Sequence, residues 1–276
     1  MIYVDGKKLA EKILAEVKRE MGDRKLTLCA IAIGDIGNAR NFLKLKQKAA
    51  ENAGISFRIY ELPENIGQEE AEKKIVEIRD GNCDGIIVEL PLPNQLNSQK
   101  LLDLIPPEKD PDVLSSLAQK NFYNNKSKIL PPSVEAVKAV FEEYKISLTD
   151  KKAAVFGQGI LVGKPTAHWL KMQGTEVSII DESTPDPEKI SKNADIIISG
   201  VGKPGLVTGN MTKDGTIIID FGFTRLRSHR KGQILGDVSS DALDKSFLAT
   251  PVPGGIGPVV VASVLKNLKL ISKDFN

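Results

Sequence analysis

The residues with the clearest chemical potential are three glycines that follow an apolar stretch near the middle of the chain. Residues 153–156 read Ala-Ala-Val-Phe, then come Gly157, Gly159 and Gly163, and helical spacing runs over residues 162–172. A strand, a glycine-rich turn and a helix in this order can bind a dinucleotide pyrophosphate, because glycines allow close backbone approach and a helix N-terminus attracts anions. The spacing G-x-G-x-x-x-G departs from the usual G-x-G-x-x-G, so a plain glycine turn stays open as an alternative.

An acidic residue stands where such a site needs one. Residues 175–180 predict a second strand. Asp181 ends that strand about twenty residues beyond the glycines, the position from which a carboxylate binds the ribose 2′-hydroxyl. Residues 194–199 and 216–220 predict two more short strands. A strand-end aspartate can also cap a loop, but the whole succession favours a nucleotide-binding domain of the Rossmann type.

The stretches before this unit predict a separate α/β layer. Nearly unbroken apolar runs alternate with segments of helical spacing, which indicates a parallel sheet covered on both faces. Glu89 stands near the end of the third apolar run, just before Pro91, and ligands of open α/β sheets collect at the carboxyl ends of strands. The expected elements are helices over residues 7–21, from a cap at Asn38 to about residue 53, and over 69–80, with strands over 26–33, 56–62 and 84–90.

Two polar segments separate this layer from the nucleotide-binding half. Residues 122–128 are polar and irregular and form a plausible linker. Ser133 is expected to cap a long amphipathic helix that leads into the second half. A last helix is expected from Val259 to about Leu268.

A loop rich in proline and glycine precedes that last helix. Residues 250–258 read Thr-Pro-Val-Pro-Gly-Gly-Ile-Gly-Pro, with three prolines and three glycines in nine positions. So many fixed or permissive dihedrals make a rigid loop that can present main-chain N–H and C=O groups to a planar ligand. A purely structural connector stays open as the alternative.

Length and charge exclude several classes of protein. A chain of 276 residues is long enough for about two domains. The net charge of +2 gives no basic footprint for nucleic acid. The apolar runs are of strand length, too short to span a bilayer, and the first residues lack the apolar core of a signal peptide. We therefore expect a cytoplasmic protein without nucleic-acid or membrane partners.

The cysteines and histidines do not suggest a metal site. Cys29 and Cys83 lie in or beside apolar runs, where a cysteine usually serves as a small buried hydrophobe. Together with the isolated His168 and His229 they do not form a familiar zinc pattern. We expect no bound metal.

Three segments occur together in the order of a known family. They are DGIIVELPLP at residues 84–93, VGKPG at 201–205 and TPVPGGIGP at 250–258. Over nearly the whole chain the sequence resembles the bifunctional methylenetetrahydrofolate dehydrogenase/methenyltetrahydrofolate cyclohydrolases, and the last segment is the most specific. The resemblance implies an α/β fold of two domains with a cleft between them, the second a Rossmann-like NAD(P)-binding domain.

The resemblance also implies a division of the chain and an activity. Residues 1–120, completed by the C-terminal helix 259–276, would form a folate-binding catalytic domain, and residues 121–258 the NAD(P)-binding Rossmann domain. A homodimer would form through the nucleotide domains. The implied activity, in one-carbon metabolism and purine biosynthesis, is oxidation of 5,10-methylenetetrahydrofolate with NADP⁺, followed by hydrolysis of the methenyl product to 10-formyltetrahydrofolate.

The catalytic lysine of the family matches Lys46. Phe42 stands where the family has a tyrosine, and a spacing of four places both side chains on one helix face. The resemblance makes Lys46 the residue expected to act in hydrolysis and Phe42 a surface for stacking the folate. Without it, Lys46 would be taken as a solvated lysine because Lys44 and Lys48 flank it, and that alternative stays open.

Glu89 replaces a glutamine that neighbours the lysine in the family. A carboxylate close to Lys46 would favour the charged ammonium, which is a poorer base. We therefore expect a dehydrogenase whose hydrolytic step is weakened or rerouted. In a rerouted step Glu89 itself would be the base, with Lys46 polarising the incoming water.

The resemblance assigns the remaining site residues. Asp112 matches the aspartate that receives hydrogen bonds from the amino-pyrimidine edge of the pterin, which an ionised carboxylate suits. Its loop departs from the family, with Pro111 before it and Val113 where glycine is usual. The expected substrate-binding residues are Phe42, Asp112, Pro253, Gly254 and Gly255, and the expected cofactor-binding residues are Gly157, Gln158, Gly159, Val162, Gly163, Asp181, Glu182, Val201, Gly202 and Ile256.

The predicted cofactor-binding residues also depart from the pattern of the family. The family often has arginine and serine where this chain has Gln158 and Glu182, and those residues hold the 2′-phosphate of NADP. A phosphate beside Asp181 and Glu182 would be repelled, so NAD⁺ is expected to be tolerated or preferred. Two other functions stay open: a Rossmann dehydrogenase of another small substrate, and a folate- or nucleotide-binding protein without turnover.

Overall fold

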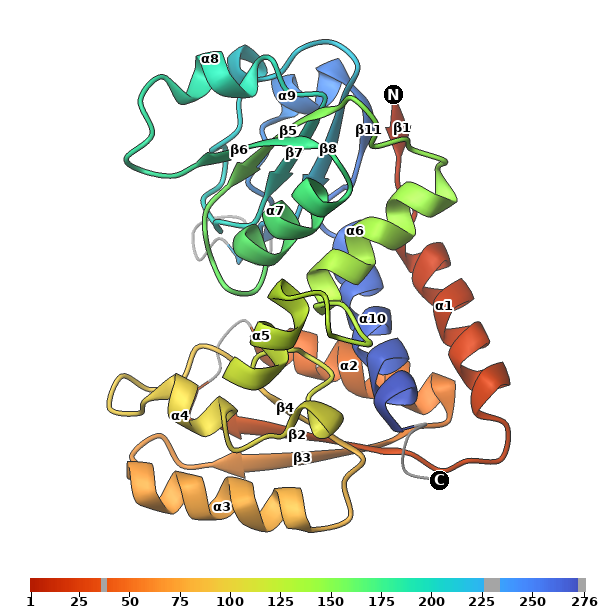
Figure 1. The fold of residues 1–276 in the computed structure, drawn as a ribbon, viewed down its shortest axis with the longest axis vertical. Coiled ribbons are helices and arrows are strands. Elements are labelled where there is room, and N and C mark those ends of the chain that lie inside the picture. Colours follow the sequence, from red (N-terminus) through yellow and green to blue (C-terminus); the bar gives the residue numbers. More distant parts are fainter. Residues whose placement is uncertain (36–38, 226–233, 273–276) are drawn as a thin grey trace. The chain divides into compact units, whose positions relative to one another are not determined.

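The computed structural model describes residues 1–35, 39–225 and 234–272 (Figure 1). Contacts divide the chain into two compact units. Unit 1 comprises Met1–Ala10 and Ser133–Val260, and unit 2 comprises Glu11–Pro132 and Val261–Asn276. This division differs from the expected boundaries: the first ten residues group with the nucleotide-binding part, and residues 121–132 group with the first part. The expected cap Asn38 and His229 lie outside the described residues.

Unit 1 is built on a parallel sheet of six strands in the order β1-β11-β8-β7-β5-β6 (Figure 1). The central strands bury all or nearly all of their residues, as isoleucine-rich strands covered on both faces do. The expected strand over 216–220 is confirmed, and those over 175–180 and 194–199 begin one and two residues later. The strands are β1 (Ile2–Tyr3), β5 (Lys152–Phe156), β6 (Glu176–Ile180), β7 (Ile196–Ser199), β8 (Thr216–Asp220) and β11 (Ser246–Ala249).

Helices cover the sheet of unit 1 on both faces. Ala154, Ile197 and Ile218 pack toward Ala242 of α9 in one core. The helices of the unit are α6 (Pro132–Glu143), α7 (Gly163–Met172), α8 (Pro187–Ser191) and α9 (Ser240–Lys245), with a 3₁₀ turn at Gly209–Met211 and a hairpin of β9 (Thr224–Arg225) and β10 (Ile234–Leu235).

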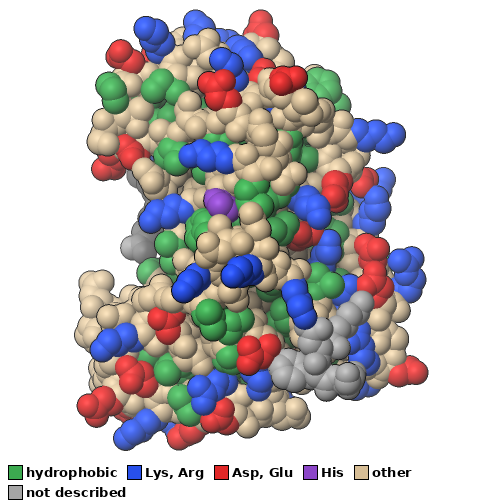
Figure 2. Space-filling model, in the orientation of Figure 1, with side chains coloured by type: hydrophobic (Ala, Val, Ile, Leu, Met, Phe, Trp, Pro, Cys, Tyr) green, Lys and Arg blue, Asp and Glu red, His purple; other side chains and the backbone are tan. Residues whose placement is uncertain are grey.

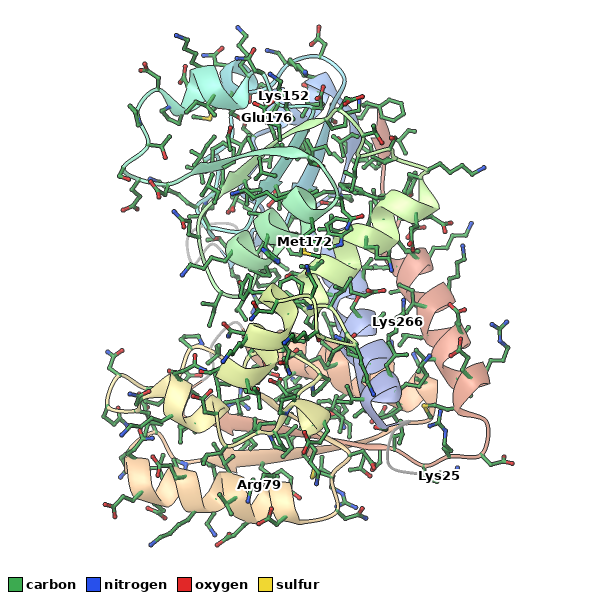
Figure 3. The ribbon with its side chains drawn as sticks, in the orientation of Figure 1. Lys25, Arg79, Lys152, Met172, Glu176 and Lys266 are labelled. Carbon is green, nitrogen blue, oxygen red and sulfur yellow. A yellow bond between two sulfur atoms is a disulfide. The ribbon has the colours of Figure 1, made fainter. Side chains whose placement is uncertain are left out.

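The outer strand β6 shows how register places charge on the surface. Lys152 of β5 and Glu176 of β6 are paired across the ladder. Their side chains form a salt bridge of 3.6 Å at the exposed start of the two strands (Figure 3). More widely, basic and acidic side chains are interspersed on the face drawn in Figure 2.

Unit 2 has a smaller parallel sheet in the order β3-β2-β4. Strand β2 is buried along its whole length, which explains its unbroken apolar sequence. On one face Ile31 and Ile86 pack with Ile75 of α3 and Leu101 of α4. The elements are β2 (Thr27–Ile33), β3 (Ser56–Leu62), β4 (Gly85–Val88), α2 (Ala39–Ala53), α3 (Gln68–Asp80), α4 (Ser98–Leu102), a 3₁₀ turn at Pro107–Lys109 and α5 (Ser116–Tyr123).

The last helix covers the opposite face of this small sheet. Helix α10 (Ile256–Ile271) begins in unit 1 and continues in unit 2, as does α1 (Gly6–Met21). A Cβ atom at Gly85 would lie 2.5 Å from Cδ1 of Leu268, so a side chain there would push α10 off the sheet. The expected last helix is thus correct in place but three residues longer at each end.

Several expectations fail for reasons of tertiary structure. Ser133 does not cap a helix but is the second residue of α6, with its hydroxyl buried. The supposed linker begins inside α5, where Phe122 is buried. Strand β1 was not predicted, since two residues carry no periodicity; it joins the sheet by pairing with β11.

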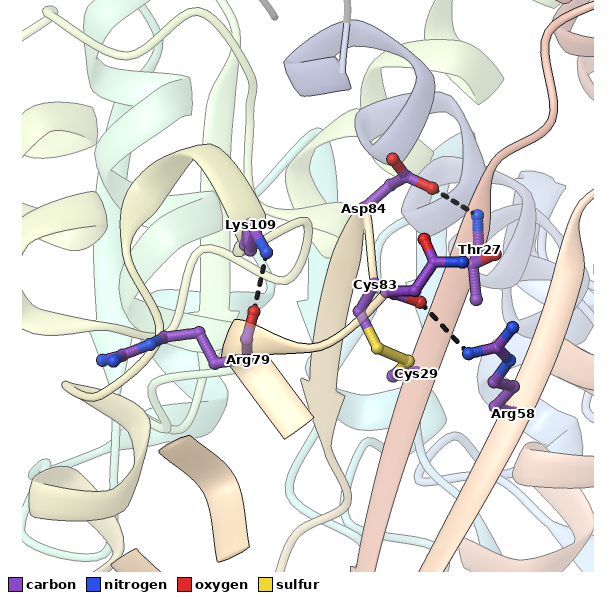
Figure 4. Close-up of a disulfide and its surroundings, with 8 residues drawn as sticks. Thr27, Cys29, Arg58, Arg79, Cys83, Asp84 and Lys109 are labelled. Carbon is purple, nitrogen blue, oxygen red and sulfur yellow. Dashed lines mark hydrogen bonds between the residues drawn. A yellow bond between two sulfur atoms is a disulfide. The ribbon is translucent and has the colours of Figure 1, made fainter. Parts of the chain in front are cut away.

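The two cysteines are paired rather than separate. Cys29 of β2 and Cys83, just before β4, form a disulfide with Cα atoms 6.0 Å apart (Figure 4). The expectation of two independent buried hydrophobes is therefore wrong, although both residues do lie in the core. Nearby, Thr27 N donates to Asp84 Oδ2 at 2.6 Å, which ties the same two strands together (Figure 4).

Membrane-spanning helices and clusters of metal ligands are both absent from the described residues. None of the helices there is long and apolar enough to cross a membrane. The same residues hold no group of three or more His, Cys, Asp or Glu side chains suited to a metal ion.

Candidate active site

A buried ion pair lies at the carboxyl end of the small sheet in unit 2. Glu89 directly follows β4, and its N–H donates to Ile31 O at 2.9 Å, which fixes its backbone to β2. Lys46 reaches it from α2 and donates from Nζ to Oε1 at 2.7 Å. The two side chains are only 14% and 6% exposed, so Lys46 is not the solvated lysine of the alternative.

Asp112 is the third charged group of this cluster. Burial raises its pKa to about 6; the Lys46 ammonium opposes that rise, while Glu89 and Asp110 add to it. Asp112 therefore interacts electrostatically with both members of the ion pair. We call Lys46, Glu89 and Asp112 the charged cluster; its two carboxyl groups outnumber its one cation, so it favours ligands that bring hydrogen-bond donors.

The loop that carries Asp112 is tightly held. Asp110 is buried, and its Oδ2 accepts from Ser115 N and Oγ, both at 2.8 Å. Asn267 on α10 donates from Nδ2 to Pro111 O at 2.9 Å and to Leu130 O at 2.8 Å. These contacts fix the loop in place. Its Pro111 and Val113 are the residues that depart from the pattern of the family.

Val113 gives this loop a strained backbone. Its φ is +57°, in the left-handed region that a β-branched residue rarely adopts, and its side chain is buried. Such a conformation costs on the order of 1–3 kcal/mol and persists only where surrounding contacts impose it. Here those contacts are the ones that place Asp112.

The glycine-rich turn in unit 1 has the geometry of a phosphate-binding turn. Gly157 has φ +86° and donates its N–H to Ile180 O at 2.8 Å. A Cβ at Gly163 would lie 2.1 Å from Gly157 O, so the first and third glycines are in contact despite the longer spacing. Gly159 has open space where a side chain would be. The turn thus leaves room for a ligand at the start of α7, a helix of ten residues whose N-terminus attracts anions.

The carboxylate expected to bind ribose is next to this turn. Asp181 Oδ1 accepts from Ser183 Oγ at 2.7 Å, and Oδ2 accepts from Gln158 Nε2 at 2.8 Å. Hydrogen bonds from Ser183 first, then from Gln158 and Thr184, lower the pKa of Asp181 to about 2. Asp181 is therefore an anion at any ordinary pH, and Glu182 beside it is exposed.

The loop after β7 meets the glycine turn. Val201 and Gly202 are both exposed, and a Cβ on Gly157 would lie 3.1 Å from Cγ2 of Val201. Val162 packs on the start of this loop, since a Cβ at Gly200 would approach its Cγ1 to 2.8 Å. The structure therefore brings together the residues of the predicted cofactor site that follow β5, β6 and β7.

The proline- and glycine-rich loop packs on the first residues of the chain. A Cβ at Gly6 would lie 1.6 Å from Gly255 O, and Gly255 N donates to Pro251 O at 2.7 Å. Gly254 has φ +99° and Pro253 is exposed. The loop thus serves as a packed connector at Gly255 while it still exposes Pro253.

Comparison with known proteins identifies the family. The model for the tetrahydrofolate dehydrogenase/cyclohydrolase catalytic domain matches residues 4–112, and the model for the NAD(P)-binding domain of the same family matches residues 131–275. The chain belongs to the tetrahydrofolate dehydrogenase/cyclohydrolase family. The resemblance stated from the sequence is confirmed, as are the α/β fold and the NAD(P)-binding domain.

Individual relatives agree along the full length. The bifunctional protein FolD of Nautilia profundicola is 36% identical over 282 residues, covering 100% of this chain and 98% of the relative. The bifunctional protein FolD of Mycoplasmopsis synoviae is 37% identical, covering 99% of this chain and 100% of the relative.

Solved structures agree as well. The bifunctional enzyme FolD of Campylobacter jejuni has a TM-score of 0.93 at 33% identity, and each chain is covered to 99%. The Trypanosoma brucei enzyme, solved with NADP and an inhibitor, has a TM-score of 0.94 at 31% identity, covering 99% of this chain and 98% of that one.

Within the tetrahydrofolate dehydrogenase/cyclohydrolase family, this chain places its predicted residues in two sets. The charged cluster, with Phe42 one turn before Lys46 on α2, lies in unit 2. The cofactor residues and the loop with Pro253, Gly254 and Gly255 lie in unit 1, where Ile256 is buried at the start of α10. The cleft expected between the domains stays a prediction.

Sequence reasoning missed three buried polar residues of unit 1. Asp220 ends β8, Ser199 ends β7, and Asp237 follows β10; all three are buried and hydrogen-bonded to one another or to neighbouring backbone. A polar residue at the end of an otherwise apolar strand was the available signal for Asp220 and Ser199. For Asp237, only the glycine before it marked a close approach.

Proposed function

We propose that this protein oxidises 5,10-methylenetetrahydrofolate to 5,10-methenyltetrahydrofolate with NAD⁺ or NADP⁺ and hydrolyses the product to 10-formyltetrahydrofolate. The charged cluster carries the proposal. Burying a lysine and two carboxyl groups costs desolvation free energy, and such clusters are typical of sites that bind or transform a ligand. Membership of the family and the names of its full-length relatives support the same activity. The match does not favour a dehydrogenase of another substrate or a binding protein without turnover.

Oxidation requires alignment more than acid–base chemistry. Asp112, when ionised, accepts hydrogen bonds from the amino-pyrimidine edge of the pterin, and Phe42 supplies a flat apolar surface. The open turn at Gly159 and the N-terminus of α7 suit the pyrophosphate of a dinucleotide, and Asp181 suits a ribose hydroxyl. Bound NAD(P)⁺ supplies the hydride acceptor.

Hydrolysis requires a base for the attacking water. The water oxygen bonds to the methenyl carbon, and one of its protons passes to a base. The hydroxyl of this adduct then loses its own proton as the formyl C=O bond forms, the carbon–N5 bond breaks and N5 takes up a proton. Lys46 donates a hydrogen bond to Glu89, so it is held as the ammonium partner and is a poor base. We propose that the Glu89 carboxylate receives the proton while Lys46 orients the water, and that this step is slower than oxidation.

One assay tests both halves. Protein is mixed with methylenetetrahydrofolate and NAD⁺ or NADP⁺, and reduced cofactor and the methenyl compound are followed by their near-ultraviolet absorbance. We expect reduced cofactor to form and the methenyl intermediate to accumulate. No reduced cofactor with either dinucleotide contradicts the dehydrogenase, and immediate conversion to the formyl product contradicts the slow hydrolysis.

Glu89→Gln provides the matched variant for the hydrolytic step. It keeps the size of the side chain and its place after β4 but removes the carboxylate. If Glu89 is the base, the variant loses hydrolysis and keeps oxidation. If Glu89 only holds Lys46 charged, the variant hydrolyses faster than the wild type, and Lys46 is the base.

We further propose that NAD⁺ is tolerated or preferred over NADP⁺. The ionised Asp181 and the exposed Glu182 stand where a 2′-phosphate would bring a further negative charge of about −1.5 to −2. Comparing kcat/KM for the two cofactors tests this, and a large preference for NADP⁺ overturns it. Asp181→Ser, which removes the anion but keeps a hydroxyl, is expected to shift the ratio toward NADP⁺.

We also propose that the protein is a homodimer formed through unit 1 and that it is cytoplasmic. The family resemblance supports the dimer. Sedimentation velocity measures the mass directly, and a single species of monomer mass at micromolar concentration contradicts the dimer.

A further inference from the structure

The buried carboxyl group of Asp237 binds the backbone of the loop after β7. Asp237 is 0% exposed, and its side chain accepts four hydrogen bonds. Oδ2 accepts from Ser199 Oγ and Val201 N, both at 2.7 Å, and from Gly202 N at 3.3 Å. Oδ1 accepts from Lys203 N at 2.8 Å. Three consecutive backbone amides and one hydroxyl therefore converge on a single side chain.

The loop lies on the surface, although the amides of residues 201–203 donate to a buried side chain. Residues 200–205 are all exposed. Gly202 has φ +78°, and its carbonyl oxygen accepts from Thr224 Oγ1 at 2.9 Å. The amides of Val201, Gly202 and Lys203 point inward to Asp237. The loop therefore cannot offer these N–H groups to a phosphate and presents its remaining carbonyl oxygens and the Val201 side chain to solvent.

A second buried aspartate fixes Asp237 in turn. Asp220 Oδ1 accepts from Asp237 N at 3.1 Å, and Oδ2 accepts from Val238 N at 3.1 Å. The approach needs glycines: a Cβ at Gly222 would lie 2.4 Å from Asp237 Oδ1, and a Cβ at Gly236 would lie 2.0 Å from Asp220 Oδ2. Hydrogen bonds therefore run from Asp220 at the end of β8 to Asp237, and from Asp237 to the loop after β7.

We infer that Asp237 is a positioning residue for dinucleotide binding, acting through the loop of Val201, Gly202 and Lys203. By drawing the three amides inward, it sets Val201 against the glycine turn and leaves acceptor groups facing the ligand. The loop then suits the hydrogen-bond donors of a dinucleotide, its carboxamide and ribose hydroxyls, while the phosphates go to the start of α7. This inference rests on the proposed function, since it takes NAD(P) as the ligand of unit 1.

Amide hydrogen exchange tests the loop without any ligand. In the wild type we expect the amides of residues 201–203 to be protected although the residues are exposed. Asp237→Asn keeps the shape but leaves one acceptor atom and adds an N–H₂ group that faces an N–H donor, so this protection should be lost. Asp241→Asn is the matched control: it makes the same change of charge in unit 1, where Asp241 accepts from Gly209 N at 2.9 Å.

Cofactor affinity tests the consequence. The dissociation constants for NADH and NADPH should rise about 10-fold or more in Asp237→Asn, as expected when a buried acceptor is lost. Affinity for a folate analogue, whose proposed contacts at Phe42 and Asp112 lie in unit 2, should change much less. Ser199→Ala removes only one of the four donors and provides a milder variant, expected to raise the constants about 2–5-fold, should Asp237→Asn not fold.

The outcomes separate the two claims. Loss of loop protection without loss of cofactor affinity overturns the positioning role. Equal weakening in Asp241→Asn also overturns it, because the effect would then be general destabilisation of unit 1. If the wild type binds neither NADH nor NADPH, the proposed function fails and this inference falls with it, while the exchange data still report whether Asp237 holds the loop.

Discussion

Unit 2 and unit 1 both hold carboxyl groups in their interiors, but they satisfy the hydrogen bonds and charge of these groups differently. In unit 2, Glu89 is paired with the ammonium of Lys46, and Asp112 interacts with both. In unit 1, Asp237 accepts from three backbone amides and a hydroxyl, and Asp220 accepts from backbone amides. Unit 2 stabilises its buried carboxylate with an opposite charge, and unit 1 stabilises its buried carboxyl groups with the dipoles of backbone N–H groups.

This difference separates a chemical site from a structural one. When charges face each other, removing one changes the protonation of the others, because each partner's field contributes to the next pKa. When backbone amides hold a carboxyl group, its orientation is fixed by the fold and few single substitutions affect it. Unit 2 is therefore the part where side-chain changes alter reactivity, and unit 1 is the part where they alter geometry.

The largest effect is expected from removing the cation of the charged cluster. Lys46→Met should slow hydrolysis about 10²–10⁴-fold, because the acid–base step would lose both the group that orients its water and the cation beside Glu89, and it should slow oxidation much less. Lys44→Met on the same helix is the control, since Lys44 is exposed. The two rates are measured separately from methenyl- and methylenetetrahydrofolate.

A buried unpaired carboxylate could itself unfold this variant, so Lys46→Met is also combined with Glu89→Gln, which removes both charges. The double variant also lacks the proposed base, so it is compared with Glu89→Gln alone. If adding Lys46→Met to Glu89→Gln lowers oxidation and hydrolysis equally, the assignment of Lys46 to hydrolysis is wrong.

The next effect concerns the disulfide, which lies in unit 2. Cys29 and Cys83 are 54 residues apart, and closing a loop of that length restricts the unfolded chain by about 4 kcal/mol in the chain-entropy model. Reduction should lower the free energy of unfolding by up to that amount and speed amide exchange in β2 more than in β8. Urea unfolding with and without dithiothreitol measures it.

The variant Cys29→Ala/Cys83→Ala is the control and should not respond to the reductant. An unfolding midpoint of the wild type that is the same with and without reductant would show that the cysteines are thiols in the isolated protein, as a reducing compartment would keep them.

A smaller effect is expected from pH. The pKa of Asp112 is raised to about 6, chiefly by burial, so the ionised form that suits the pterin edge prevails only above that pH. KM for methylenetetrahydrofolate should therefore rise as pH falls through about 6. Glu89 contributes to the raised pKa, so Glu89→Gln should move this acid limb to lower pH.

The comparison between the units provides the control. The carboxylate that faces the cofactor, Asp181, has a pKa lowered to about 2 and stays ionised. Affinity for NADH should consequently not follow the same acid limb. An unchanged limb in Glu89→Gln would mean that the two carboxyl groups of the charged cluster do not interact in solution.

The smallest effect is expected at the strained valine. In Val113→Gly the relief of about 1–3 kcal/mol of backbone strain offsets the lost burial, so stability should change by no more than about 1 kcal/mol. Val155→Gly in β5, equally buried but unstrained, should cost about 3 kcal/mol. Thermal or urea unfolding of the two variants decides this, and equal losses would mean that Val113 carries no strain.

The sequence predicted the regular elements well because their signal is local. The strand over residues 56–62 and the helices around residues 7–21 and 69–80 follow from periodicity alone, and the structure confirms them within one residue. The glycine turn was predictable in the same way, since its glycines are close in sequence.

The contacts that were missed join residues far apart in the chain. Ser199 and Asp237 are separated by 38 residues, and Asn267 and Pro111 by 156. No local pattern predicts that a particular hydroxyl or amide meets a particular partner across such a distance. For the same reason the resemblance could name Lys46 and Glu89, while only the structure could establish that they touch.

The pairing of β1 with β11 has a consequence for how the protein is made. The second and third residues of the chain lie beside residues 248 and 249. During synthesis β1 has no partner strand until residues 248 and 249 have been made, so the sheet of unit 1 cannot acquire that edge before then. A fragment starting at residue 133 would lack both this strand and Gly6, against which Gly255 packs. Neither unit can be expressed as one continuous segment without giving up part of its own packing.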